Sequence, residues 1–247
     1  MIPYVRRKQI LEVMQKKDIV YLEELAERLN VSLATVRRDL ISLEEDDFIT
    51  ILKGGAAQLK QNVIERSLTE KLKINEEEKD HLGKYAATLV NDGDFIYLGP
   101  GTTEHWMIKY LKDKNVTIVT NGAFHLDELR RLNIETIVLG GSLNNRIAVI
   151  TGTEALKQVD AMNFDKSFLG VSGYTSDHGA MTSDEGVSNI NRAAMKNSNK
   201  TYILLDSSKL GITSRFVYAK PDTRARFITT SKADIEYRKL KNFMFIE

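Results

Sequence analysis

The 247-residue sequence has no cysteine, only four histidines and three prolines, and no long apolar run. Without cysteine, disulfide frameworks, thiolate metal sites and cysteine nucleophiles are excluded. The histidines are scattered without the spacing of metal ligands on a helix, so we expect neither a metal nor a cofactor. No stretch approaches the roughly 18 apolar residues of a membrane span, and the N-terminus does not resemble a signal peptide. We therefore expect a cytoplasmic protein with no membrane partner.

A charge excess of either sign is also missing, because 35 Lys and Arg residues face 34 Asp and Glu residues. Nucleic-acid binding would therefore need a local basic patch rather than a chain-wide field. The composition, with 42% hydrophobic and 28% charged residues, is that of a globular protein. Gly54 and Gly55 are the only glycines before residue 60, whereas glycine-containing loops recur after residue 90. This contrast predicts a small N-terminal module followed by a larger domain.

The first 57 residues predict a winged helix-turn-helix. Three helices are indicated, the second by apolar residues at helical spacing between Leu22 and Leu29, and the third by Val36, Leu40 and Leu43. About three residues join the second helix to the third, which is the outline of a helix-turn-helix. The β-rich residues 48–53, followed by two glycines, predict a two-stranded wing.

Small, hydroxyl and arginine side chains gather on the solvent-facing side of the third helix, where they suit the major groove of DNA. The candidate DNA-binding residues there are Ser32, Ala34, Thr35, Arg37, Arg38 and Ser42. Arg6, Arg7 and Lys53 are candidates for contacts to the phosphate backbone. The module has nine basic and ten acidic residues, so only the placement of charge favours DNA. Helix geometry alone leaves a protein-interaction module open as an alternative.

Residues 58–75 are predicted to form a linker, and residues 76–247 to form an α/β domain. Short β-rich runs alternate there with helical stretches, a pattern typical of a largely parallel sheet covered on both faces. Polar glycine loops follow successive strands, and open parallel sheets bind ligands at the carboxyl ends of their strands. The candidate effector-binding residues are Gly99, Gly101, Thr102, Thr103, Thr120, Asn121, Gly140, Gly141, Asp184, Glu185 and Lys209. Free N–H groups and threonine hydroxyls suit an anion, and Lys209 supplies a cation for a phosphate.

The string VSLATVRRDL at residues 31–40, with GGA at residues 54–56, resembles the winged helix of the DeoR family of bacterial repressors. The strings GTT at 101–103, VTN at 119–121, LGG at 139–141, GVSG at 170–173, TSDE at 182–185 and SKLG at 208–211 resemble its effector domain. The resemblance implies a repressor of a sugar-metabolism operon that binds operator double-stranded DNA. It also implies a fold similar to ribose-5-phosphate isomerase and a phosphorylated sugar as inducer. Because one winged helix contacts a single half-site and binds weakly, we also expect a homo-oligomer. The variant GPG at residues 99–101 resembles the branch of the lactose phosphotransferase system repressor, whose inducer is tagatose 6-phosphate.

An alternative function is a sugar-phosphate isomerase-like enzyme with an accessory helical domain. Such chemistry needs a positioned general base, and Asp177, Asp184 and Glu185 are the carboxylates near the loops. The lysine- and glycine-rich string of the isomerases is missing after the acidic loop, and a DNA-binding module favours sensing over turnover. We therefore expect no catalytic residue in this chain.

Overall fold

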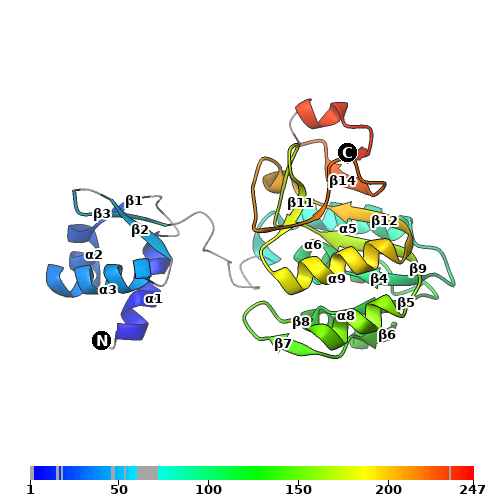
Figure 1. Ribbon diagram of the computed structural model, residues 1–247, viewed down its shortest axis with the longest axis horizontal. Coiled ribbons are helices and arrows are strands. Elements are labelled where there is room, and N and C mark those ends of the chain that lie inside the picture. The colour runs from blue at the N-terminus through cyan, green and yellow to red at the C-terminus, as the bar shows by residue number, and fades with distance from the viewer. Residues whose placement is uncertain are drawn as a thin grey trace. The chain divides into compact units, whose positions relative to one another are not determined.

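The computed structural model describes residues 3–14, 17, 19–45, 48–52, 54–59, 72–233 and 235–247. The chain divides into two compact units, Met1–Arg66 and Ser67–Glu247 (Figure 1). Most of the linker expected over residues 58–75, namely residues 60–71, lies outside the described residues.

The N-terminal unit consists of three helices and a small antiparallel sheet. The helices are α1 (Pro3–Met14), α2 (Leu22–Leu29) and α3 (Leu33–Glu45), and the strands are β1 (Ile19–Tyr21), β2 (Ile49–Leu52) and β3 (Ala56–Leu59), in the order β1-β3-β2. Apolar residues of all three helices bury one core, with Ile10, Leu25 and Leu40 fully inside it. The predicted helices and wing are thus present, and the wing also pairs with β1.

Two short turns in this unit require residues that tolerate positive φ. Asn30, at φ 51°, ends α2 so that the chain can enter α3. Gly54 and Gly55, at φ 92° and 77°, connect β2 to β3. A β-branched residue at either glycine would strain the backbone, so the glycine pair fixes the sharpness of the wing.

The second unit is built on a seven-stranded sheet in which every neighbouring pair is parallel. Its strand order is β15-β14-β12-β9-β4-β5-β6. The strands are β4 (Phe95–Leu98), β5 (Thr117–Thr120), β6 (Glu135–Val138), β9 (Phe164–Gly170), β12 (Ser198–Leu204), β14 (Arg226–Thr230) and β15 (Phe243–Ile246). Because all seven run the same way, the loops after them meet at one edge of the sheet.

Helices cover both faces of this sheet (Figure 1). One apolar cluster joins the sheet to α8 (Thr153–Asp160) and α9 (Glu185–Lys196), and a second joins it to α5 (Glu76–Thr88), α6 (Thr102–Ile108) and α7 (Leu126–Arg131). Tyr97 belongs to the first cluster, whereas its neighbours Ile96 and Leu98 belong to the second. This alternation follows from the two-residue period of a strand and confirms the predicted covered parallel sheet.

Smaller elements lie in the segments that follow the carboxyl ends of the strands. They are the hairpin β7 (Ser142–Asn144) and β8 (Val149–Thr151), a sheet of β10 (Gly173–Thr175), β11 (Gly179–Thr182) and β13 (Phe216–Ala219), and the 3-10 turns η1 (Ala123–His125), η2 (Ser207–Lys209) and η3 (Ile235–Lys239). In the described part of the chain, no helix is both long and apolar enough to cross a bilayer.

Candidate DNA-binding surface and effector site

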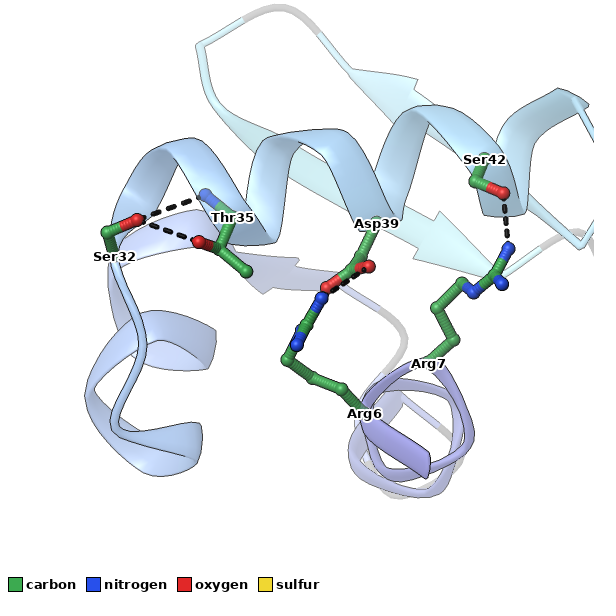
Figure 2. A network of polar contacts seen from close by, with 6 residues as sticks. All are labelled: Arg6, Arg7, Ser32, Thr35, Asp39 and Ser42. Atoms are coloured by element: carbon green, nitrogen blue, oxygen red, sulfur yellow. Dashed lines mark hydrogen bonds and ion pairs between the residues drawn. The ribbon is translucent and has the colours of Figure 1, made fainter. Parts of the chain in front are cut away.

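The outer face of α3 presents the arrangement that the sequence predicts. Val36 is fully buried, whereas Ala34, Arg37 and Arg38 are exposed. The hydroxyl of Ser32 accepts a hydrogen bond from the backbone N–H of Thr35 at 3.2 Å and lies 2.8 Å from the Thr35 hydroxyl (Figure 2). Ser32 therefore caps the helix, and two arginines project from its first two turns.

Arg6 has a different place from the one expected, because it does not project into solvent. Its side chain is buried against α3, where Nε and Nη2 donate to the two carboxylate oxygens of Asp39, the second bond at 3.1 Å (Figure 2). Hydrogen bonding to Asp39 raises the pKa of Arg6, so the guanidinium group keeps its charge. A bidentate arginine–carboxylate pair has a fixed geometry, and it sets α3 against α1.

Arg7, the next residue of α1, donates to the hydroxyl of Ser42 near the end of α3 (Figure 2). Both side chains are half-buried, so Ser42 is engaged within the unit. Lys53, the candidate contact from the wing, lies outside the described residues. The backbone N–H of Ile51 in β2 donates to Glu44 Oε1 at 2.7 Å, which ties the wing to α3.

In the second unit, Ser67–Glu247, the predicted loops meet at the carboxyl edge of the seven-stranded sheet. Gly99 and Gly101 lie in the loop after β4, Thr102 and Thr103 begin α6, and the neighbouring strand β5 ends at Thr120, directly before Asn121. The Tyr97 hydroxyl donates to Asn121 Oδ1 at 2.8 Å, and Asn121 Nδ2 donates to the carbonyl of Ile150 at 2.9 Å. Thr103, Thr120 and Asn121 are buried, whereas Gly101 and Thr102 are half-buried.

A buried carboxylate, Glu104, lies beneath these loops. Its side chain is fully buried, and Oε1 accepts a hydrogen bond from the backbone N–H of Gly101 at 3.2 Å. A Cβ atom added at Gly99, Gly101 or Gly170 would lie within 3 Å of this carboxyl group and would force it to shift. Burial raises the pKa of Glu104 to about 7. The carboxyl group therefore changes its charge near neutral pH directly under the candidate anion loop.

His125 is the second buried titratable group at this edge. Its Nε2 lies 3.3 Å from the carbonyl oxygen of Gly101, and its Nδ1 lies 3.4 Å from the Thr120 hydroxyl. Burial lowers the pKa of His125 to about 3, so the ring is neutral and connects the loops after β4 and β5.

The remaining candidates fall into two groups at the same edge. Gly141 and Gly186 both pack against Thr151, which brings the exposed Gly140-Gly141 loop next to the turn of Asp184 and Glu185. Asp184 caps α9 by accepting from the backbone N–H of Val187 at 2.9 Å, and Glu185 is exposed. Lys209 is half-buried in η2 after β12, which stands two strands from β4, a separation of about 10 Å. Among the described residues, no group of three His, Asp or Glu side chains is arranged to hold a metal ion.

Sequence comparison identifies both units. The DeoR-like helix-turn-helix domain matches residues 6–62, and the DeoR C-terminal sensor domain matches residues 74–231. The chain belongs to the DeoR family. It is 36% identical to an uncharacterised HTH-type transcriptional regulator, FruR of Bacillus subtilis, over 94% of this chain and 92% of that protein. Its identity to the lactose phosphotransferase system repressor of Staphylococcus epidermidis is 34%, over 84% of each chain.

DeoR-family relatives of this chain are named as transcriptional regulators and repressors, not as enzymes. Among solved structures, ribose-5-phosphate isomerase A of Methanocaldococcus jannaschii aligns over 60% of this chain and 58% of that chain, with 20% identity and a TM-score of 0.42.

Several buried residues that hold these loops in place were not predicted from the sequence. Glu104 follows Gly101 at the three-residue spacing of a capping box, a signal that could have marked it. His125 and Glu78 carry no such signal, because neither belongs to a recognisable sequence motif.

Proposed function

We propose that this DeoR-family repressor reads its operator with α3 and is released from it by a phosphorylated sugar bound at the carboxyl edge of the effector sheet. The observation that carries the first half is the pair of exposed arginines, Arg37 and Arg38, on a capped helix that a buried ion pair fixes against α1. Such a helix start fits the major groove, where arginine can bind guanine through two hydrogen bonds. Arg7 supplies a contact to the phosphate backbone, and Arg6 is left out of the contact set.

Substitution of the two arginines tests the DNA surface. Arg38→Ala should weaken operator binding by about 1–3 kcal/mol if Arg38 reads a base, and the double variant Arg37→Ala/Arg38→Ala should bind still more weakly. Arg130→Ala removes an equally exposed arginine from α7 and should leave the affinity unchanged. Fluorescence anisotropy with a labelled operator measures all three. A folded double variant with wild-type affinity would place the DNA contact elsewhere.

The proposed effector site takes a sugar phosphate with its phosphate on residues 101–103 and its hydroxyls toward Asp184 and Glu185. The N–H of Gly101 already donates to Glu104, so the donors for the phosphate are the backbone and hydroxyl groups of Thr102 and Thr103. Lys209 reaches the same edge from η2 and supplies a positive charge. Tagatose 6-phosphate is our first candidate, because the chain is similar over most of its length to lactose phosphotransferase system repressors.

Titration of the operator complex with tagatose 6-phosphate, fructose 6-phosphate, glucose 6-phosphate and ribose 5-phosphate tests the effector. We expect one of them to release the operator from the wild-type chain. Lys209→Ala should raise the concentration needed for release about tenfold while operator affinity without effector stays near normal. Lys200→Ala, an exposed lysine in β12 before the strand reaches the carboxyl edge, is the matched control and should respond like the wild type. Release of Lys209→Ala at wild-type concentrations would reject this site.

A further inference from the structure

A buried polar network ties the start of α5 to the loop that carries Lys209. Asn75 stands immediately before α5, on the side of the chain that leads from the DNA-binding unit, and its backbone adopts φ 51°. Its Nδ2 donates to Asp206 Oδ1 at 2.7 Å, across 131 residues of sequence. The residue directly before α5 is therefore bonded to the loop after β12.

Glu78, in the first turn of α5, makes the second and larger part of this connection. Its side chain is buried, and Oε1 accepts from the backbone N–H of Ser207 at 2.7 Å and from the Thr230 hydroxyl at 2.5 Å. Its other oxygen, Oε2, accepts from the Ser207 hydroxyl at 2.9 Å. One carboxylate thus joins α5 to the loop after β12 and to the last residue of the adjacent strand β14.

Asp206 completes the network from the loop side. Its side chain is 1% exposed, and Oδ1 also accepts from the backbone N–H of Ser208 at 3.2 Å and from the Ser208 hydroxyl. Its Oδ2 is buried without a hydrogen-bond partner among the described residues. Hydrogen bonds to Asn75 and Glu78 therefore hold residues 206–209 against the start of α5. Lys209, on the same turn, belongs to the proposed effector site.

We propose that Asn75 and Glu78 are positioning residues that couple the effector loop, residues 206–209, to the chain leading to the DNA-binding unit. A buried donor or acceptor that loses its partner is costly, so a displacement of the loop must displace the start of α5 with it. Binding at Lys209 then biases the segment that holds the winged helix, which is the differential contact that a ligand needs to shift a conformational equilibrium. This inference rests on the proposed function, because it requires an effector that contacts Lys209.

The test separates effector binding from effector response in the full-length chain. Asn75→Gly removes the side-chain amide and keeps the left-handed backbone, which glycine adopts readily. Glu78→Gln is the second variant, since it keeps the shape and removes the charge and one acceptor. Asn133→Gly is the matched control, an exposed asparagine at φ 54° at the end of α7. Calorimetry with each of the four sugar phosphates gives the dissociation constant of the effector, and operator anisotropy with and without saturating effector gives the coupling factor.

We expect the wild type and Asn133→Gly to lose operator affinity at least about tenfold on saturation with effector. Asn75→Gly and Glu78→Gln should bind the effector within about threefold of the wild type, yet lose less than about threefold of operator affinity. Wild-type coupling in both variants overturns the proposal. It is also overturned if both variants lose operator binding in the absence of effector, because the two residues are then needed for folding alone. If no sugar phosphate affects the wild type, the proposed effector is wrong and the coupling falls with it, a result that the wild-type titration alone reveals.

Discussion

At the scale of single residues, two buried titratable groups lie beside the proposed effector site, and their pKa values are displaced in opposite directions. Burial raises the pKa of Glu104 to about 7 and lowers that of His125 to about 3. Both shifts have one cause, because a medium of low dielectric constant disfavours the charged form of an acid and of a base alike. Near neutral pH the histidine is neutral, and the carboxyl group is divided between its two forms.

Glu104→Gln should change the pH dependence of stability. The folded carboxyl group has a pKa of about 7 against 4.5 unfolded, so the folded state holds an extra proton between these values. Wild-type stability therefore falls as pH rises through this window, by roughly 3 kcal/mol at about 1.4 kcal/mol per pKa unit. The variant lacks this loss and should gain stability relative to the wild type from pH 5 to pH 8. Urea unfolding followed by fluorescence of Trp106, the single tryptophan, reports on this unit.

His125 should change the stability with pH in the opposite direction to Glu104. Its folded pKa of about 3 lies below the unfolded value of 6.5, so its contribution to stability is lost as pH falls below 6.5. Between pH 4.5 and 6.5 the two effects oppose each other in the wild type. In Glu104→Gln only the histidine effect remains, and stability should rise with pH there. Parallel stability curves for the variant and the wild type would show that Glu104 has an ordinary pKa.

At the scale of elements, the packing of α3 depends on a buried charge pair that the sequence alone does not reveal. The sequence predicts a DNA contact for Arg6 because this arginine stands beside Arg7 and Lys8 near the start of a helix. In the fold it is buried and paired with Asp39, and the outward arginines are those of α3. Only the packing of α1 against α3 separates the two roles.

The double variant Arg6→Met/Asp39→Leu tests this assignment. Replacing a buried ion pair by an apolar pair is often tolerated, whereas removing one partner leaves an uncompensated charge. We expect the double variant to fold and to keep an unchanged slope of operator affinity against salt concentration. The single variant Asp39→Leu should lower the melting temperature of the N-terminal unit. Arg7→Met, which removes a proposed phosphate contact, should reduce the salt slope by about one. A similar reduction in the double variant would return Arg6 to the DNA surface.

Sequence periodicity predicted those elements whose signal is local. The apolar face between Leu22 and Leu29 forms α2, and the β-rich residues 48–53 contain β2, which spans Ile49–Leu52. The hairpin β7–β8, the sheet of β10, β11 and β13, and the outer strands β14 and β15 were not predicted. Of these, β13 and β14 pair with strands that are distant in sequence, as where Ala180 pairs with Ala219, and no local pattern encodes that partner, whereas β7–β8 and β10–β11 are local hairpins. The glycine loops were predicted as a site, but the carboxyl group against which their glycines pack was not.

At the scale of the whole molecule, the proposed switch links two units that have separate cores. Each unit buries its own apolar cluster, so each can keep its fold while their relation changes. A coupling of about 1.4 kcal/mol gives a tenfold loss of operator affinity, well within the usual allosteric range. The network of Asn75, Glu78 and Asp206 is placed to supply such a coupling without disturbing either core.

We also expect the protein to bind DNA as a homo-oligomer. One winged helix contacts a single half-site, so an operator of useful affinity should contain repeated half-sites on one face of the duplex, about 10 base pairs or a multiple apart. Inserting five base pairs between the half-sites turns them to opposite faces and should lower affinity more than tenfold. Inserting ten restores the facing and should recover much of it. Sedimentation of the operator complex measures the number of chains bound. A single chain per operator, with affinity indifferent to both insertions, would show that one recognition helix is enough.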